Sequence, residues 1–179
     1  VGRIPVSFRS LGVTSLSLSA HKFHGPIGVG ALIVEKSDFL YPVLAGGHQE
    51  RGFRPGTEPV PLVVGMAWAL ERAIHELAET TSRLQRLQQF FVEGLREHLG
   101  SIFLNGPTQD RVPNTVNLRF PELDAQAAVL ALDLLGLACS TGSACASGAR
   151  TPSHTLLAMG LSEEHARSSL RFSFSRLTT

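Results

Sequence analysis

A long stretch of helical periodicity divides this chain and limits the folds open to it. From about Leu62 to Leu99, apolar residues recur at steps of three, four and seven, and Gly100 follows as a helix stop. The polar residues 79–82, Glu-Thr-Thr-Ser, predict a break into two helices or a boundary between domains. A free-standing coiled coil is the alternative, but the mixed apolar content and the short length disfavour it.

Short strands are predicted on the N-terminal side of this stretch. Residues 14–19 alternate apolar and small polar side chains, which is typical of a strand that leads into a loop. Gly28–Val34 is a nearly continuous apolar run and predicts a strand buried on both faces of a sheet. Residues 45–57 then lack periodicity and are rich in glycine, arginine and proline. A loop of that length is more often functional than incidental.

Alternating elements return after Gly100. We expect strands at 101–104, 115–120 and 170–175, and helices at 124–135, 152–159 and 162–168. The last of these helices opens with Ser162 as its cap. The fold class is therefore predicted to be α/β, with residues 1–78 in one domain and residues 79–179 in a smaller α+β domain.

The bulk composition excludes several classes of function. The 16 Lys and Arg residues nearly balance the 15 Asp and Glu residues, which leaves no electrostatic footprint for nucleic acid or an anionic membrane. No apolar run approaches the roughly 20 residues needed to span a bilayer. The opening residues 1–5 lack an apolar signal core. Two cysteines, Cys139 and Cys145, do not make a disulfide framework, so a cytoplasmic location is expected.

Metal and dinucleotide sites are also disfavoured. The chain has no Cys-x-x-Cys pair for zinc. His21, His24 and His48 could be taken for a metal site, but no carboxylate at a suitable spacing supports them. The glycines in 28–30 resemble part of a dinucleotide fingerprint that lacks its third glycine. We therefore predict no intrinsic metal site.

The segment 19–26, Ser-Ala-His-Lys-Phe-His-Gly-Pro, offers an amine beside phosphate donors. Lys22 follows a predicted strand, and the neighbouring Phe23 favours desolvation of its amine for imine chemistry. The Ser19 hydroxyl and the His21 imidazole are groups that can hold a phosphate. An ordinary solvated loop lysine is the alternative. A phosphate anchor together with an imine-forming lysine indicates pyridoxal 5'-phosphate as the cofactor.

The segment 140–145, Ser-Thr-Gly-Ser-Ala-Cys, offers a thiol on a loop of small residues. Cys145 can attack a sulfur or carbon electrophile, and the glycines and alanines around it give a flexible mount. A buried structural cysteine is the alternative for Cys145. For Cys139, which follows Leu137 and Ala138, that structural interpretation is the better one.

Four motifs in order resemble the NifS-like cysteine desulfurases of the class-V aminotransferase family, which are fold-type-I pyridoxal-phosphate enzymes. They are Ser-x-His-Lys-x-x-Gly-Pro-x-Gly at 19–28, Gly-Gly-His-Gln-Glu-Arg-Gly-Phe-Arg-Pro-Gly-Thr at 46–57, Ser-x-Gly-Ser-Ala-Cys at 140–145, and Ser-Leu-Arg-Phe-Ser-Phe-Ser-Arg at 169–176. The likeness covers essentially the whole chain. It implies that residues 1–78 are the C-terminal part of the large cofactor-binding domain. Residues 79–179 are then the small C-terminal domain with the catalytic cysteine loop.

The resemblance implies roles for the cofactor-binding residues. Lys22 forms the covalent imine with pyridoxal phosphate, and Ser19 and His21 hold its phosphate. Thr57 reaches the phosphate of a neighbouring subunit, so the enzyme is expected to be a homodimer. Roles for Arg51 and Arg54 stay open between the cofactor entrance and the dimer contact.

The resemblance also implies a substrate and a partner. Arg171 pairs with the α-carboxylate of L-cysteine, a role suited to its planar fork. Cys145 takes the sulfur to form a persulfide and leaves L-alanine. The persulfide is delivered to an acceptor such as an iron–sulfur scaffold, where Cys145 can transiently contact the cluster. A selenocysteine lyase, another class-V lyase or an inactive piece are the alternatives, since the family's N-terminal half, with its ring-stacking histidine and aspartate, is expected to be missing here.

Overall fold

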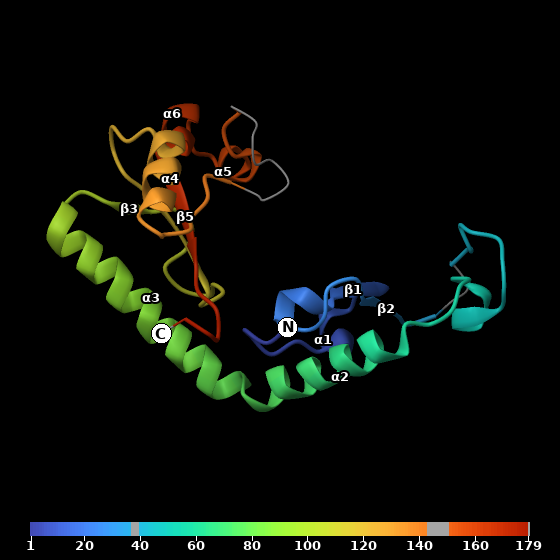
Figure 1. Ribbon diagram of the computed structural model, residues 1–179. Helices are drawn as coiled ribbons and strands as arrows, with labels where there is room; N and C mark the ends of the chain where they lie inside the picture. The colour runs from blue at the N-terminus through green and yellow to red at the C-terminus, as the bar shows by residue number, and fades with distance from the viewer. Residues whose placement is uncertain (37–39, 143–150, 179) are drawn as a thin grey trace. The chain divides into compact units, whose positions relative to one another are not determined.

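The chain forms two compact units, each with its own sheet and core. The computed structural model describes residues 1–36, 40–142 and 151–178. The first unit is Val1–Ala78 and the second is Glu79–Thr179. Figure 1 labels their helices and strands. The chain is thus a mixed α/β structure, and the boundary between its two units falls near the start of its longest helix.

The first unit is built on a β-hairpin and one long helix. Strands β1 (Ser15–Ser19) and β2 (Gly30–Val34) pair antiparallel, with Ser19 opposite Gly30 (Figure 1). Gly30 is required because a Cβ there would lie 2.5 Å from the carbonyl oxygen of Leu18. The unit also contains α1 (Phe8–Leu11), the 3-10 helices η1 (Ala20–Phe23) and η2 (Gln49–Gly52), and α2 (Val60–His75).

A small core joins the hairpin to α2. Ala20 and Phe23 of η1 pack with Met66 and Ala69 of α2, and all four side chains are at most 8% exposed. The turn after β1 is therefore fixed by burial on its inner side. Burial of a side chain the size of Phe23 or Met66 stabilises the fold by about 1.5–3 kcal/mol.

The strand at β2 differs from the expectation drawn from its apolar sequence. Residues 30–33 are exposed, and Leu32 is 55% exposed. In the described part of the chain β2 pairs with β1 alone, as one of the two strands of a small sheet. The prediction that Gly28–Val34 is buried on both faces is wrong for these residues taken by themselves.

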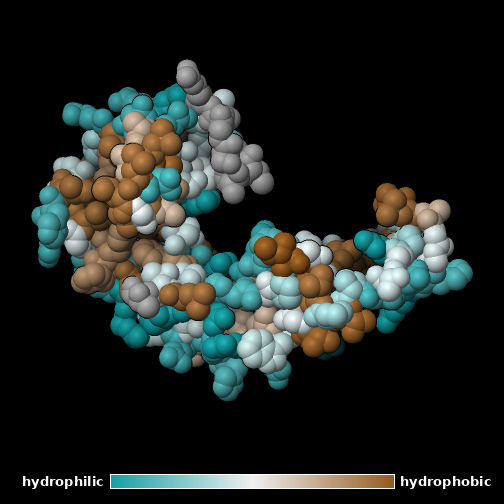
Figure 2. Space-filling view, in the orientation of Figure 1, coloured by the Kyte–Doolittle hydropathy of each residue, from teal (hydrophilic) through white to brown (hydrophobic). Residues whose placement is uncertain are grey.

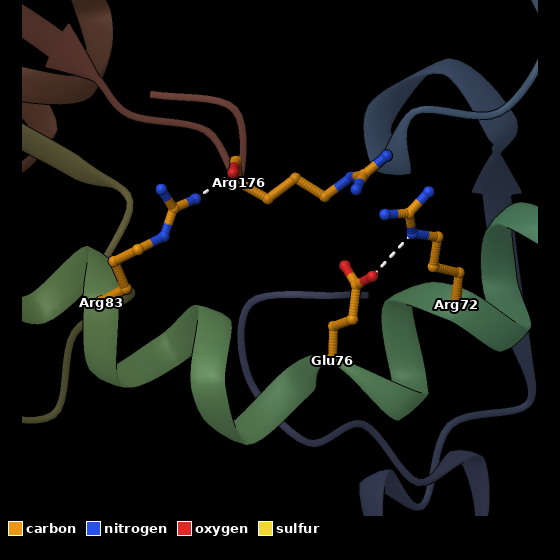
Figure 3. A network of polar contacts seen from close by, with 4 residues as sticks. All are labelled: Arg72, Glu76, Arg83 and Arg176. Carbon is orange, nitrogen blue, oxygen red and sulfur yellow. Dashed lines mark hydrogen bonds and ion pairs between the residues drawn. The ribbon is translucent and has the colours of Figure 1, made fainter. Parts of the chain in front are cut away.

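The long helical stretch breaks earlier than its polar residues suggest. Helix α2 ends at His75 and α3 (Leu77–Leu99) begins two residues later. Arg72 donates to the Glu76 carboxylate at 2.6 Å across this junction, as Figure 3 shows. The helix break predicted at 79–82 is wrong because these polar residues form the first turns of α3, where Thr80 is 8% exposed. The alternative, a domain boundary at these residues, stays a prediction, and the two compact units divide after Ala78.

The second unit contains a three-stranded antiparallel sheet. Its order is β3 (Phe103–Leu104), β4 (Thr115–Arg119) and β5 (Ser169–Ser173). The remaining helices are α4 (Ala125–Leu134), α5 (His154–Ala158) and α6 (Glu163–Arg167). Asp124 and Ser162 cap α4 and α6 through side-chain oxygens that accept backbone N–H groups, as the sequence predicts for Ser162.

One face of this sheet is apolar and packs on α3. Val116 and Leu118 of β4 are at most 1% exposed, and Phe91 of α3 lies against them. The Phe91 ring is 4.9 Å from the Phe172 ring, centroid to centroid, and the planes are tilted. Since side chains alternate along a strand, the residues between these point to the opposite face. The sheet therefore separates an apolar core from a second, polar face.

The C-terminal segment is tied to α3 by one arginine. Arg83 donates to the main-chain carbonyl oxygens of Arg176 and of Thr178, the latter at 2.8 Å. Figure 3 shows the bond to Arg176. The chain after β5 is thus held on the same helix that covers the apolar face.

Hydrophobic side chains also reach the surface in both units (Figure 2). Leu130 and Leu134 of α4 are 69% and 89% exposed. No helix among the described residues combines the length and the apolar character that crossing a membrane requires.

We predict that Leu118→Ala lowers the free energy of unfolding by about 2–5 kcal/mol, because it removes a fully buried side chain from the sheet core. Leu134→Ala is the matched control, since it truncates the same residue type at an 89% exposed position, and it should change stability by less than about 0.5 kcal/mol. Urea unfolding followed by circular dichroism measures both. Equal losses from the two variants contradict the assignment of this core.

Candidate active site

The predicted cofactor lysine lies on a sharp turn directly after β1. The chain enters η1 at Ala20, so that His21 and Lys22 are exposed while Ala20 and Phe23 point into the core. The expectation that Phe23 desolvates Lys22 is therefore wrong within this unit. A 3-10 helix has three residues per turn, and this separates the aromatic ring from its neighbouring amine. Lys22 is instead presented to the surface on a buried base.

Small residues hold this turn tightly. Gly25 N–H donates to the Ala20 carbonyl oxygen at 2.9 Å. A Cβ on Gly25 would approach the Ala20 Cβ to 3.0 Å, so a larger residue would force the two segments apart. His24 closes the turn in the left-handed conformation, with φ of 66°. The position of the Lys22 backbone is thus set by packing on both sides of it.

The predicted phosphate ligands lie at the same turn. Ser19 is the last residue of β1 and is half-buried, and its side chain does not cap η1. His21 is exposed one turn position before Lys22. The structure therefore brings Ser19, His21 and Lys22 together on one short segment.

Thr57 ends a loop in the same unit that is closed by a glutamine. Gln49 Oε1 accepts a hydrogen bond from Gly56 N–H at 3.2 Å, which joins the two ends of the loop. Between them, Glu50 and Arg51 have φ of 47° and 59°, a left-handed conformation that costs non-glycine residues free energy. Thr57 is exposed just beyond this closure.

The first unit also has an apolar hollow of about 250 Å³. Leu16, Leu18, Ile33, Leu70 and Ile74 are among its lining residues. It contains none of the predicted cofactor ligands, and its lining offers no catalytic group. The hollow therefore does not locate the chemistry.

In the second unit, Arg171 lies beside the start of the cysteine loop. Arg171 N–H donates to the Ser140 carbonyl oxygen at 2.6 Å, and Ser140 N–H donates back to the Arg171 carbonyl oxygen at 3.1 Å. The Ser140 hydroxyl donates to the Gly142 carbonyl oxygen at 3.0 Å. Ser140 thus joins the sheet as an extra paired residue, five residues before Cys145. Cys145 itself is outside the described residues.

A row of side chains crosses the polar face of this sheet. Asn117 of β4 is opposite Arg171 of β5, and Asn105 N–H donates to the Asn117 carbonyl oxygen from the outer strand. Directly opposite residues in antiparallel strands share a face. Asn105, Asn117, Arg171 and Ser140 therefore lie side by side across the sheet.

The two asparagines in this row are linked to a buried serine. Asn105 Nδ2 donates to Asn117 Oδ1 at 2.6 Å and to Ser169 Oγ at 2.9 Å. Ser169 is fully buried, and its hydroxyl donates to the His165 carbonyl oxygen of α6 at 2.6 Å. The network fixes the polar face from both the strands and α6.

Arg171 keeps one unsatisfied donor in this setting. Its Nε is buried and has no hydrogen-bond partner among the described residues. Leaving a buried charged donor unpaired is costly, so such a group indicates a missing acceptor. A carboxylate is the acceptor that matches the planar fork of a guanidinium.

Cys139 differs from a reactive thiol. It is half-buried and free, directly before Ser140. Burial raises the pKa of its thiol, and the negative charge of Asp133 raises it further. Because the thiolate is the nucleophile, this environment supports the structural role predicted for Cys139.

The predicted site residues thus fall into two groups, Ser19, His21, Lys22 and Thr57 in the first unit and Arg171 in the second. Sequence reasoning missed Asn105, Asn117 and Gln49, although the polar residues at alternate positions of β4 could have indicated Asn117. Among the described residues, no three His, Cys, Asp or Glu side chains gather in a way that could hold a metal ion.

Comparisons with known proteins agree on one family. The cysteine desulfurase of Gluconacetobacter diazotrophicus is 44% identical over all 179 residues, which correspond to 45% of that protein. The cysteine desulfurase IscS of Dictyoglomus turgidum is 43% identical over the same length. The chain spans about 45% of the length of these curated relatives.

Solved structures give the same result. A NifS-like protein superposes with a TM-score of 0.87 at 35% identity, covering 99% of this chain and 45% of that one. SspA, solved in complex with cysteine, has a TM-score of 0.73 at 30% identity and is matched over 48% of its chain. The family model described as aminotransferase class-V matches residues 1–179. With its whole length matched by that model, the chain belongs to the class-V aminotransferase family.

Proposed function

We propose that this chain carries the catalytic lysine, the substrate-binding arginine and the sulfur-accepting cysteine of a pyridoxal-phosphate-dependent cysteine desulfurase. The observation that carries the proposal is the pair of main-chain hydrogen bonds between Ser140 and Arg171. They join the start of the Cys145 loop to the arginine whose buried Nε lacks a partner. A carboxylate held at Arg171 thereby lies next to the segment that bears the nucleophile.

The turn after β1 fits the cofactor. Lys22 is exposed on a rigid base, and Ser19 and His21 flank it with a hydroxyl and an imidazole. These groups would hold the aldehyde and the phosphate of pyridoxal phosphate, with Thr57 reaching the phosphate of a second subunit. When bound, the cofactor ring withdraws electrons from the substrate α-carbon. Lys22 then moves protons to and from that carbon.

Cys145 accepts the sulfur of L-cysteine. Its thiolate forms a bond to the substrate sulfur while the bond between that sulfur and the substrate β-carbon breaks. The electron pair of the broken bond stays with the carbon skeleton, which gains a proton and leaves as L-alanine. The enzyme keeps the sulfur as a persulfide. The similarity to SspA, which was solved with cysteine, supports this substrate.

The persulfide implies further partners. Its transfer requires a thiol-bearing acceptor, such as an iron–sulfur scaffold protein, and Cys145 can contact the growing cluster while it delivers sulfur. We propose a homodimer, in which Thr57 of one subunit completes the phosphate site of the other. The proposed location is the cytoplasm.

We predict that Lys22→Ala abolishes covalent attachment of pyridoxal phosphate. Lys36→Ala is the matched control, since Lys22 and Lys36 are the only lysines in these 179 residues. Borohydride reduction followed by peptide mass spectrometry locates the attachment site, and absorbance reports cofactor loading. Labelling of Lys36, with unchanged absorbance in Lys22→Ala, would falsify the assignment.

The two thiols should respond differently to substitution. Cys145→Ser should leave cofactor loading intact and lower sulfide release from L-cysteine by at least about 100-fold, because the nucleophile is lost. Cys139→Ser should keep the rate within about twofold. Sulfide assays on both variants test this, and equal losses would instead indicate that the cysteines act as a pair.

Cys139 should also alkylate at a higher pH in the folded protein than in the unfolded one. Its pKa is raised by folding, so the protonated thiol stabilises the fold below the ordinary thiol pKa. That contribution is lost as the pH rises through the raised value. Iodoacetamide labelling of the Cys139 peptide, with and without urea, measures the shift. The same pH midpoint in both conditions contradicts the burial of this thiol.

A further inference from the structure

The polar row on the β-sheet has a feature that substrate binding at Arg171 leaves unexplained, namely a fixed neutral amide beside the guanidinium. We propose that Asn117, held by Asn105 and Ser169, is a positioning residue that keeps Arg171 free of an internal partner and oriented for the substrate carboxylate. The inference rests on the proposed function, because it concerns how that same arginine recognises the carboxylate of an amino acid.

Asn117 and Arg171 form the kind of cross-strand pair in which the two side chains come closest to each other. The N–H and carbonyl groups of Arg171 both point to Ser140, so none is left for β4. The pair formed by Asn117 and Arg171 is therefore of the type without hydrogen bonds between its two backbones. In such pairs the Cα atoms come within about 4.5 Å and the side chains approach most closely.

The amide of Asn117 is oriented from the far side of the row. Its Oδ1 accepts the short bond from Asn105 Nδ2, and that same Nδ2 is anchored on the fully buried Ser169. The remaining Nδ2 of Asn117 is a donor, and a guanidinium has no acceptor to receive it. Asn117 thus occupies the space next to Arg171 and makes no ion pair with it.

The charges around Arg171 agree with this role. No carboxylate of a described residue forms an ion pair with Arg171, and the other members of the polar row, Asn105, Asn117 and Ser140, have neutral side chains. The buried Nε keeps its hydrogen unpaired as a consequence. An external carboxylate then gains a charge-assisted bond without displacing an internal one.

The test is Asn117→Asp, which has nearly the same shape and keeps an oxygen to accept the bond from Asn105. It adds a negative charge opposite Arg171 and should satisfy the guanidinium internally. In the holoenzyme we expect the KM for L-cysteine to rise at least about tenfold while kcat stays within about threefold. Binding of L-alanine and of ethylamine, which lacks the carboxylate, is measured by the absorbance of the cofactor. The preference for L-alanine over ethylamine should fall at least about tenfold.

Asn114→Asp is the matched control. Asn114 precedes β4 on the same segment and is 6% exposed, and its side chain bonds to Thr115 rather than to the polar row. The same substitution there should lower the melting temperature but leave the preference for L-alanine within about twofold. Asn117→Ala is a second test variant that adds no charge. It should reduce the preference for L-alanine about threefold, because it removes the amide beside Arg171 and leaves Asn105 without the Asn117 oxygen.

Arg171→Ala separates this inference from the function on which it rests. If Arg171→Ala keeps the preference for L-alanine, the proposed role of Arg171 in carboxylate binding fails. If Arg171→Ala loses the preference while both folded Asn117 variants keep it within twofold, the positioning role alone is overturned. Equal loss in Asn114→Asp and Asn117→Asp also overturns it, because a general effect on the fold then explains the result.

Discussion

The pairing of Ser140 with Arg171 is the contact on which the functional interpretation of the second unit depends. Two main-chain hydrogen bonds join Ser140, five residues before the proposed nucleophile Cys145, to the last strand of the sheet. The same bonds use the backbone N–H and carbonyl groups of Arg171, which lies directly opposite Asn117 of β4. One backbone arrangement thus sets both the starting point of the cysteine loop and the surroundings of the arginine.

In the first unit, side-chain packing and not sheet pairing fixes the backbone near the predicted site residues. Ala20 and Phe23 are buried on α2, and Gly25 lies against Ala20 where no side chain fits. His21 and Lys22, which lie between these buried residues, are therefore exposed. The proposed cofactor lysine therefore lies on a segment whose backbone is held by packing on both sides.

The two faces of the sheet in the second unit are lined by different kinds of residue. Val116, Leu118 and the phenylalanines around Phe91 form the apolar face against α3, where loss of a side chain should destabilise the unit. Asn117 and Arg171 lie at alternate positions on the other face. Because side chains alternate along a strand, the apolar face and the polar face belong to the same strands but are formed by different residues.

The sequence by itself determined many of the elements and indicated candidate reactive groups. Its periodicity indicated β1, β4, α4 and α6 with the Ser162 cap, and its motifs singled out Lys22, Arg171 and Cys145. Tertiary structure decided what local pattern does not encode. The helix break lies at Glu76 because polar residues 79–82 are good first-turn residues, and Phe23 turns to the core and away from Lys22. The neighbours of Arg171 come from two separate segments, and only strand register, a long-range property, brings Asn117 and Ser140 to its two sides.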